Sequence, residues 1–111
     1  MLLQSFLENS ARLYPNKVAL IYKDARLTYA EINRRANQVA VLLRSQGIKR
    51  GDRVAIFLEN SVKSVISLFG ILKADAVFVM LSPQLKAPKL EYILNNCGAK
   101  ALISDVSRLN A

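Results

Sequence analysis

The chain has 111 residues, of which 52% are apolar and 22% charged, a balance that fits one globular domain and excludes an intrinsically disordered chain. Its formal net charge of +8 comes from 16 lysines and arginines spread along the sequence, so a solvated basic surface is favoured over a specific nucleic-acid site. One cysteine permits no internal disulfide, and the absence of histidine excludes ordinary zinc sites and serine triads.

The first predicted helix ends at Pro15, because proline restricts the residue before it and cannot continue the hydrogen-bond ladder. Apolar residues recur at helical spacing ahead of it: Leu3, Phe6, Leu7, Ala11 and Tyr14. Residues 18–22 then form an apolar, partly β-branched run, which residues 23–25 separate from a short segment at 26–28. This pattern predicts a small β-hairpin.

A second helix is predicted to begin at Tyr29. Thr28 and Glu31 form a T-x-x-E capping box, in which the threonine oxygen accepts from an early helix amide and the glutamate reaches back to the cap. Gly47 supplies a left-handed residue at the helix end. The apolar face that this helix presents comprises Tyr29, Ile32, Ala36, Val39, Ala40 and Leu43.

A turn at residues 49–52 leads into residues 53–58, an apolar run that is typical of a parallel strand covered on both faces. Asn60 or Ser61 can cap the next helix, which is expected to be deeply buried because it is apolar almost all round. Its apolar residues are Val62, Val65, Ile66, Leu68, Phe69, Ile71 and Leu72. A second buried strand is predicted at residues 76–81.

A last helix is predicted between Pro88, which suits its first turn, and Gly98, which suits its end. A strand at residues 101–104 follows, with a further helix expected after it. Strands that alternate with helices predict right-handed β-α-β units. The expected fold class is therefore α/β: a partial parallel sheet of β-α-β units flanked by helices, with a small N-terminal hairpin. Ligands of such sheets bind beyond the carboxyl ends of the strands.

No membrane-spanning or secretory segment is expected. The most apolar region, residues 64–81, is interrupted by Lys73 and Asp75, so it lacks an uninterrupted run near the roughly 20 residues that span a bilayer. No cationic segment precedes an apolar stretch at the N-terminus. These features predict a cytoplasmic location.

Three segments occur in the order and spacing found in one enzyme family. They are residues 27–32 (LTYAEI), residues 51–56 (GDRVAI) and residues 72–83 (LKADAVFVMLSP). Through them the chain resembles the opening of the AMP-dependent synthetase and ligase superfamily, which includes acyl-CoA ligases, luciferases and the adenylation domains of peptide synthetases. The resemblance runs from about Leu3 to Asp105. It implies that residues 1–111 are an N-terminal fragment of the AMP-binding (adenylation) domain, and thus an incomplete N-terminal domain of an adenylate-forming enzyme.

The third segment departs from the family pattern, which usually has glycine where this chain has Asp75, proline at Met80, and asparagine or aspartate near Ser82. Glycine accepts a positive φ without steric penalty, whereas aspartate tolerates it only moderately and brings a charge into a crowded turn. If that backbone geometry is required, Asp75 costs about 1 kcal/mol. Either this branch uses a different turn, or selection for activity has relaxed, which would affect catalytic competence but not the fold.

The resemblance implies that the intact enzyme activates a carboxylic acid with ATP and magnesium, releases pyrophosphate, and passes the acyl group to coenzyme A or a carrier pantetheine. Holding the ATP phosphates takes a glycine-rich loop with serine, threonine and lysine. The four glycines, at positions 47, 51, 70 and 98, form none. In the family, the adenine site, the magnesium-binding glutamate, the ribose-binding aspartate and the C-terminal lysine lie further downstream. We therefore predict no catalytic, cofactor-binding or metal-binding residue in this chain, and no cofactor bound by it alone.

The remaining reactive side chains favour structural roles. Cys97 lacks a histidine to activate it, and its helical spacing with Leu90, Ile93 and Leu94 predicts a buried packing position. Asp52 and Asp105 are scattered carboxylates that suit turns. Arg53 is expected to neutralise Asp52 or to remain solvated.

Three functional hypotheses follow. The first is the N-terminal fragment of an AMP-forming ligase, most like an acyl-CoA synthetase of fatty acid metabolism, which is inactive alone and serves as scaffold. The second is a stand-alone interaction module derived from such an enzyme, whose uncovered sheet edge and apolar faces favour self-association or docking. The third, a basic nucleic-acid binder, ranks last because the cations are not clustered.

Overall fold

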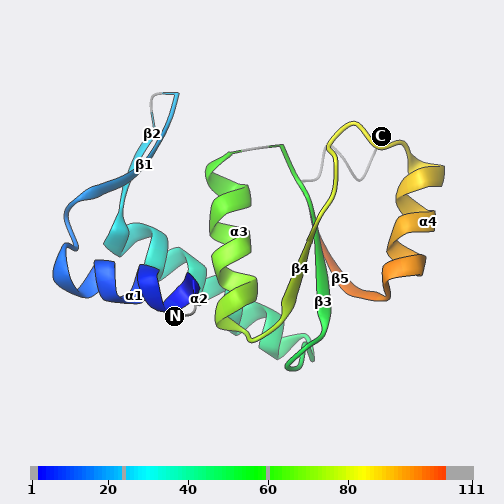
Figure 1. The fold of residues 1–111 in the computed structure, drawn as a ribbon, viewed down its shortest axis with the longest axis horizontal. Helices are drawn as coiled ribbons and strands as arrows, with labels where there is room; N and C mark the ends of the chain where they lie inside the picture. Colours follow the sequence, from blue (N-terminus) through cyan, green and yellow to red (C-terminus); the bar gives the residue numbers. More distant parts are fainter. Residues whose placement is uncertain (1–2, 24, 60, 105–111) are drawn as a thin grey trace.

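The protein is described by a computed structural model that covers residues 3–23, 25–59 and 61–104 (Figure 1). Within these residues the parallel strands lie in the order β4-β3-β5, and β1 and β2 form a separate antiparallel hairpin. The α/β class and the β-α-β arrangement are confirmed. The elements are α1 (Leu3–Leu13), β1 (Val18–Tyr22), β2 (Ala25–Thr28), α2 (Tyr29–Ser45), β3 (Arg53–Phe57), α3 (Val62–Lys73), β4 (Val77–Met80), α4 (Ala87–Cys97) and β5 (Ala99–Ser104).

The central strand β3 is buried on both faces, as its apolar run predicts. Val54 and Ile56 face the core that α2 and α3 complete, whereas Ala55 and Phe57 face the core beneath α4. Figure 1 shows the same layering, with α3 on one side of the sheet and α4 on the other. Side chains alternate along β3 with the period of two expected of a strand, so this one element links both cores.

A third core joins α1 and the hairpin to α2 and α3. Leu7 of α1 and Leu27 of β2 are buried in it. The predicted helix and hairpin are both present, although much of the predicted α1 face is open to solvent: Phe6 is 51% exposed and Tyr14 59%. Helical spacing therefore predicted the element correctly but overstated its burial, because α1 lies at the periphery.

Helix α2 begins and packs as its sequence predicts. The Thr28 oxygen accepts from the Glu31 amide at 3.2 Å, and the Glu31 carboxylate accepts from the Thr28 hydroxyl, also at 3.2 Å. The second contact differs from the capping box, in which the glutamate accepts from the cap's backbone amide. The fully buried residues of α2 all belong to its predicted face: Ile32, Ala36, Ala40 and Leu43.

Helix α3 is capped by Ser61, while Asn60 lies outside the described residues. Its most buried positions correct the prediction, because most of its large apolar residues are only partly buried. The buried positions are Ser64, Ile66, Ser67, Gly70 and Ile71, three of which are small. A Cβ built on Gly70 would lie 2.5 Å from both Cβ and Cγ1 of Val39. Gly70 thus allows α3 to lie directly against α2. A count of apolar side chains does not detect this contact, because glycine has no side chain.

The elements after α3 lie where they are predicted. Strand β4 lies within the segment expected at residues 76–81, and Pro88 lies in the first turn of α4. The predicted burial of this strand is wrong, because Val77 and Met80 are exposed and Phe78 and Val79 are only partly buried in a strand that has β3 as its one neighbour among the described residues. Gly98 ends that helix in the left-handed conformation, with φ of 68°. Strand β5 covers the segment expected at residues 101–104, whereas the helix expected after it lies outside the described residues. In the described part of the chain, every helix is too short or too polar to cross a bilayer.

Helices α2 and α3 end in the same backbone motif. Gly47 and Asp75 each have positive φ, 90° and 61°, directly after the C-cap residue. Both ends show the paired hydrogen bonds of a Schellman motif. These run from Gly47 N to Arg44 O (3.0 Å), Ile48 N to Leu43 O (3.1 Å), Asp75 N to Leu72 O (3.0 Å) and Ala76 N to Ile71 O (3.1 Å). The positive φ considered for Asp75 is therefore present, but its side chain is exposed rather than crowded.

We predict that Asp75→Gly raises the free energy of unfolding by about 1 kcal/mol. Glycine removes the left-handed penalty, and it also removes a negative charge from a helix C-terminus, where the helix dipole disfavours it. Urea denaturation measures the change. The matched control, Gly47→Asp, puts aspartate into the same motif at the end of α2 and should lose a similar amount. Equal stabilities for Asp75→Gly and the parent would contradict this account of the turn.

Candidate functional site

A hollow of about 420 Å³ lies at the carboxyl ends of β3 and β5. Its strand side is formed by Leu58, which follows β3, and by Ile103 and Ser104 at the end of β5. The helix side is formed by Val39, Lys63, Ile66 and Ser67. This is the edge at which ligands of parallel α/β sheets bind. It is therefore the candidate functional site of the described chain.

The side chains around this hollow offer mainly apolar contact and one cation. Among the described residues that line it, Lys63 is the one ionisable residue. The nearby serines at the start of α3 are engaged in capping: Ser64 Oγ donates to the Ser61 carbonyl at 2.8 Å and accepts from the Ser61 amide at 2.9 Å. Two hydroxyl side chains, those of Ser67 and Ser104, also line the hollow. The hollow can form a largely apolar wall against a ligand.

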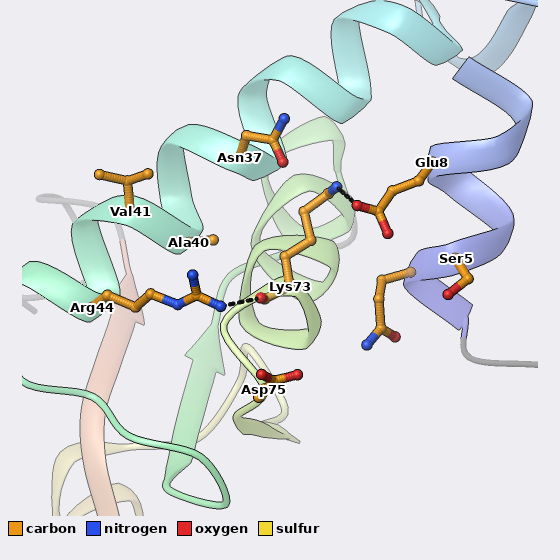
Figure 2. Close-up of a pocket in the computed structure, with 9 residues that line it drawn as sticks. Ser5, Glu8, Asn37, Ala40, Val41, Arg44, Lys73 and Asp75 are labelled. Atoms are coloured by element: carbon orange, nitrogen blue, oxygen red, sulfur yellow. Dashed lines mark hydrogen bonds and ion pairs between the residues drawn. The ribbon is translucent and has the colours of Figure 1, made fainter. Parts of the chain in front are cut away.

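A second hollow of about 430 Å³ lies between α1, α2 and the end of α3, and its lining is polar (Figure 2). Figure 2 shows Lys73 reaching between the helices to Glu8, with 3.1 Å between Nζ and Oε2. Arg44 Nη2 donates to the Lys73 carbonyl at 2.9 Å, and Gln4 donates to the Leu72 carbonyl at 3.3 Å. Side chains of α1 and α2 therefore bind carbonyls of the last turn of α3, of which that of Leu72 also accepts from the Asp75 amide.

This polar hollow lies away from the candidate site. Helix α3 connects the carboxyl end of β3 to the amino end of β4, so its C-terminus and Asp75 lie at the amino ends of the parallel strands. The amide of Gly51 donates to the Asp75 carbonyl at 2.9 Å, which ties the two turns at this edge together. Asp75 therefore lies at the edge of the sheet opposite to the candidate site, where we expect it to affect the stability of the fold rather than ligand binding. Met80, the other main departure from the family pattern, is the last residue of β4 and does lie at the carboxyl edge.

The ion pair between Glu8 and Lys73 yields a prediction about stability. The Lys73 side chain is only 5% exposed, whereas that of Glu8 is 52% exposed. We expect Glu8→Ala to lower the free energy of unfolding by about 1–2 kcal/mol, because it leaves a buried ammonium without its carboxylate. In a Lys73→Met background, which removes that charge, the same change should cost much less. A double-mutant cycle by chemical denaturation measures the difference, and equal costs in both backgrounds would contradict it.

The other residues selected from the sequence occupy structural positions. Asp52 accepts from the Lys49 amide at 2.8 Å, which confirms its predicted role in a turn. Arg53 is exposed, as expected for a solvated residue, and its Nη1 also donates to the Cys97 carbonyl at 2.6 Å, at the end of α4. Asp105 lies outside the described residues.

Cys97 is half-buried rather than buried, which corrects its predicted position. Its Sγ lies 3.6 Å from the Leu94 carbonyl in the preceding turn. Leu90, Ile93 and Leu94 do pack against the sheet, but all of α4 is only partly buried because one helix covers this face. Within residues 3–23, 25–59 and 61–104, histidine, cysteine and carboxylate side chains form no cluster of three or more that could hold a metal ion.

Comparison with known proteins explains the three sequence segments and the fold together. The model of the family described as "AMP-binding enzyme" matches residues 7–111. This chain belongs to that family. The membership confirms the resemblance to adenylate-forming enzymes.

Among curated proteins, this family member is similar to bacitracin synthase 1 from Bacillus licheniformis, at 37% identity over 96% of the chain. It is similar also to the zwittermicin A synthase ZmaJ from Bacillus cereus, at 37% identity over 92% of the chain. The chain spans 2% of the first protein and 19% of the second.

Among solved structures, the anthranilate CoA ligase AuaEII in complex with anthranoyl-AMP matches 96% of the chain with a TM-score of 0.90 and 34% identity. The match covers 21% of that ligase.

Proposed function

We propose that residues 1–111 form the front of the AMP-binding domain of an enzyme that converts a carboxylic acid and ATP to an acyl-adenylate and pyrophosphate. The acyl group then passes to a thiol. The observation that carries this proposal is the match to AuaEII over nearly the whole chain, since that ligase was solved with an acyl-adenylate, anthranoyl-AMP. Magnesium is the expected counter-ion of the ATP phosphates in such a reaction.

Within that enzyme the chain acts as scaffold. Its strands and helices build two packed cores around β3. The polar side chains of Arg44, Arg53 and Ser64 form hydrogen bonds to backbone groups at helix ends. The hollow at the carboxyl edge supplies one wall of the acyl-adenylate region. Binding of a small ligand requires a largely formed concave pocket, and one apolar wall with a single lysine does not provide it. The chain alone is therefore expected to bind neither ATP nor a carboxylic acid.

Coenzyme A is the first candidate for the thiol acceptor, supported by the name and structural similarity of the anthranilate CoA ligase. A carrier pantetheine is the second, supported by the similarity to the synthases of bacitracin and zwittermicin A. Both acceptors present the same reactive thiol. A place in fatty acid metabolism and a cytoplasmic location stay predictions.

A chimera tests the scaffold role. Residues 7–104 replace the matching segment of AuaEII, and anthranilate-dependent exchange of labelled pyrophosphate into ATP is measured. We expect the chimera to catalyse exchange, because the replaced segment supplies packing and the reacting groups come from the remainder of the ligase. The same chimera with Gly70→Val is the control, and it should lose exchange together with folding.

Circular dichroism and thermal unfolding show whether each chimera is folded. A chimera that folds with native-like cooperativity and still binds anthranoyl-AMP, but has no exchange, would show that the replaced segment carries reacting groups. That result would overturn the scaffold role.

A further inference from the structure

Helix α1 contributes little to the packing around the parallel sheet. It belongs to the third core alone, where Leu7 is its one fully buried residue among the described side chains. The cores on the two faces of β3 are built, within the described residues, from α2, α3, α4, the strands and their connecting segments. Figure 1 shows α1 at the end of the molecule away from this sheet. Both of these cores would therefore stay packed if α1 left its position.

Two side-chain bonds tie α1 to the rest of the described chain, and both reach the end of α3. Glu8 Oε2 lies 3.1 Å from Lys73 Nζ, and Gln4 donates to the Leu72 carbonyl at 3.3 Å. Figure 2 shows the ion pair bridging the space between α1 and α3. Neither bond belongs to a core that contains β3, so both can break without disturbing the sheet.

The segment that follows α1 is fixed by backbone hydrogen bonds to the start of α2. The Ala30 amide donates to the Pro15 carbonyl at 3.2 Å, and the Tyr29 amide donates to the Lys17 carbonyl at 3.1 Å. Pro15 also interrupts the helix, because it lacks an amide hydrogen and disfavours helical geometry in the residue before it. The chain can therefore bend ahead of Pro15 while the residues from Pro15 onward keep their place on α2.

Helix α1 is also short, so its helical form depends on docking. It has 11 residues, and isolated helices of fewer than about 12–15 residues are marginal in water. The large apolar side chains of Phe6 and Leu13 are exposed and give it little further support. Detachment of α1 would therefore also unfold it and release its backbone amides to water.

We propose that α1 is a strap that opens and closes over the seam between α2 and α3 while α2, α3 and the sheet stay folded. The hinge lies between Tyr14 and Pro15. In the closed state Leu7 packs in the third core and Glu8 pairs with Lys73. In the open state α1 is unfolded, and the polar hollow of about 430 Å³ that it helps to line is uncovered. The strap thus controls the access of solvent to the end of α3.

Amide hydrogen exchange of the parent chain, followed residue by residue by NMR, tests whether α1 opens by itself. We expect the amides of α1 to exchange about 100-fold faster than those of β3 after correction for intrinsic rates, with one common protection factor along the helix. Urea should change this factor little, because a local opening exposes little surface. Equal protection and equal urea slopes in α1 and β3 would overturn the proposal. Protection that rises steadily from the N-terminal end of α1 would also contradict it, since that pattern is fraying of a helix end.

A variant of α1 tests the attachment to α3. Glu8→Ala weakens the closed state, from which both the opening of α1 and the unfolding of the whole chain start. We therefore expect exchange to become about tenfold faster in α1 and in β3 alike. Arg12→Ala is the matched control, because it removes a charge from an exposed residue of the same helix and should change the rates by less than about threefold. Exchange in α1 that is no faster in Glu8→Ala than in the control would rule out the ion pair as an attachment of the strap.

A variant of the sheet separates opening of α1 from unfolding of the whole chain. Ile56 is fully buried in a core that the open state keeps. Ile56→Val should therefore make exchange in β3 about fivefold faster and leave the rates in α1 unchanged. Acceleration of α1 and β3 by the same factor in Ile56→Val would mean that α1 opens only when the sheet unfolds, and the proposal would then be wrong.

Discussion

Replacement of Gly70 by alanine is expected to lower the free energy of unfolding by about 2–3 kcal/mol, although alanine is the better helix former by about 1 kcal/mol. The added methyl group would lie 2.5 Å from Cβ and Cγ1 of Val39 and 3.2 Å from the Ala36 carbonyl. Val39 Cβ is fixed to the α2 backbone, so a change of rotamer cannot relieve the overlap. Helices α2 and α3 must move apart, which loosens the core between them and the sheet.

Chemical denaturation of Gly70→Ala measures this loss, with Ser67→Ala as the matched control. Ser67 lies one turn earlier on the same buried side of α3, and its replacement adds no atom. We expect the control to change stability by less than about 1 kcal/mol. A Gly70→Ala variant at least as stable as the parent would mean that α2 and α3 are not in such close contact.

Replacement of Ile71 by alanine is expected to lower the free energy of unfolding by about 3–4 kcal/mol. Ile71 is fully buried in the main core, where α3 faces the sheet and Val54 and Ile56 of β3. Truncation removes three carbon atoms and leaves a cavity that neighbouring helices and strands cannot fill without moving. Gly70→Ala and Ile71→Ala therefore probe overpacking and underpacking at adjacent positions.

The same denaturation experiment checks Ile71→Ala against two references. Ile71→Val removes one methyl group and should lose only about 1 kcal/mol. Val41→Ala truncates an α2 residue that is 67% exposed and should change stability by no more than about 0.5 kcal/mol. Losses of similar size for Ile71→Ala and Val41→Ala would contradict the placement of Ile71 in the core.

Local sequence rules predicted the elements because each element has a clear start or stop. Thr28, Pro88 and Gly98 lie at or next to the helix ends that they predict, and the apolar run at residues 53–58 became the central strand. The rules failed for burial. An apolar surface around α3 suggested that its large residues are its most buried, but α2 contacts α3 at Gly70, and Ser64 and Ser67 are buried as well. Ser64, Ser67 and Gly70 recur at every third residue along α3. This regular spacing of small residues is the sequence signal that could have indicated a close contact.

Side-chain partners distant in sequence could not be predicted from local patterns. Lys73 pairs with Glu8, 65 residues away, and Arg53 binds the carbonyl of Cys97, 44 residues away. Each partnership depends on how whole helices are placed by the sheet. The candidate site was predictable only as a location, the carboxyl edge, since topology fixes that edge while packing decides which side chains reach it.

The position of Asp75 resolves one question that the sequence raised. Its positive φ is real and costs stability, but the residue lies at the amino ends of the strands, opposite to the hollow between Leu58 and Ser104. We therefore expect the glycine-to-aspartate departure to affect the stability of the fold rather than the chemistry at the carboxyl edge. Met80 lies at the carboxyl end of β4, so a change there is the more direct way to alter the candidate site.

Exchange of labelled pyrophosphate into ATP by the purified 111-residue chain tests the central claim most directly. The assay contains magnesium and a broad set of carboxylic acids, with intact AuaEII and anthranilate as the positive control. We predict no carboxylate-dependent label in ATP from the chain, because in the proposed function it acts as scaffold and the reacting groups lie outside it. Carboxylate-dependent exchange above the level without enzyme, retained after further purification, would contradict the account.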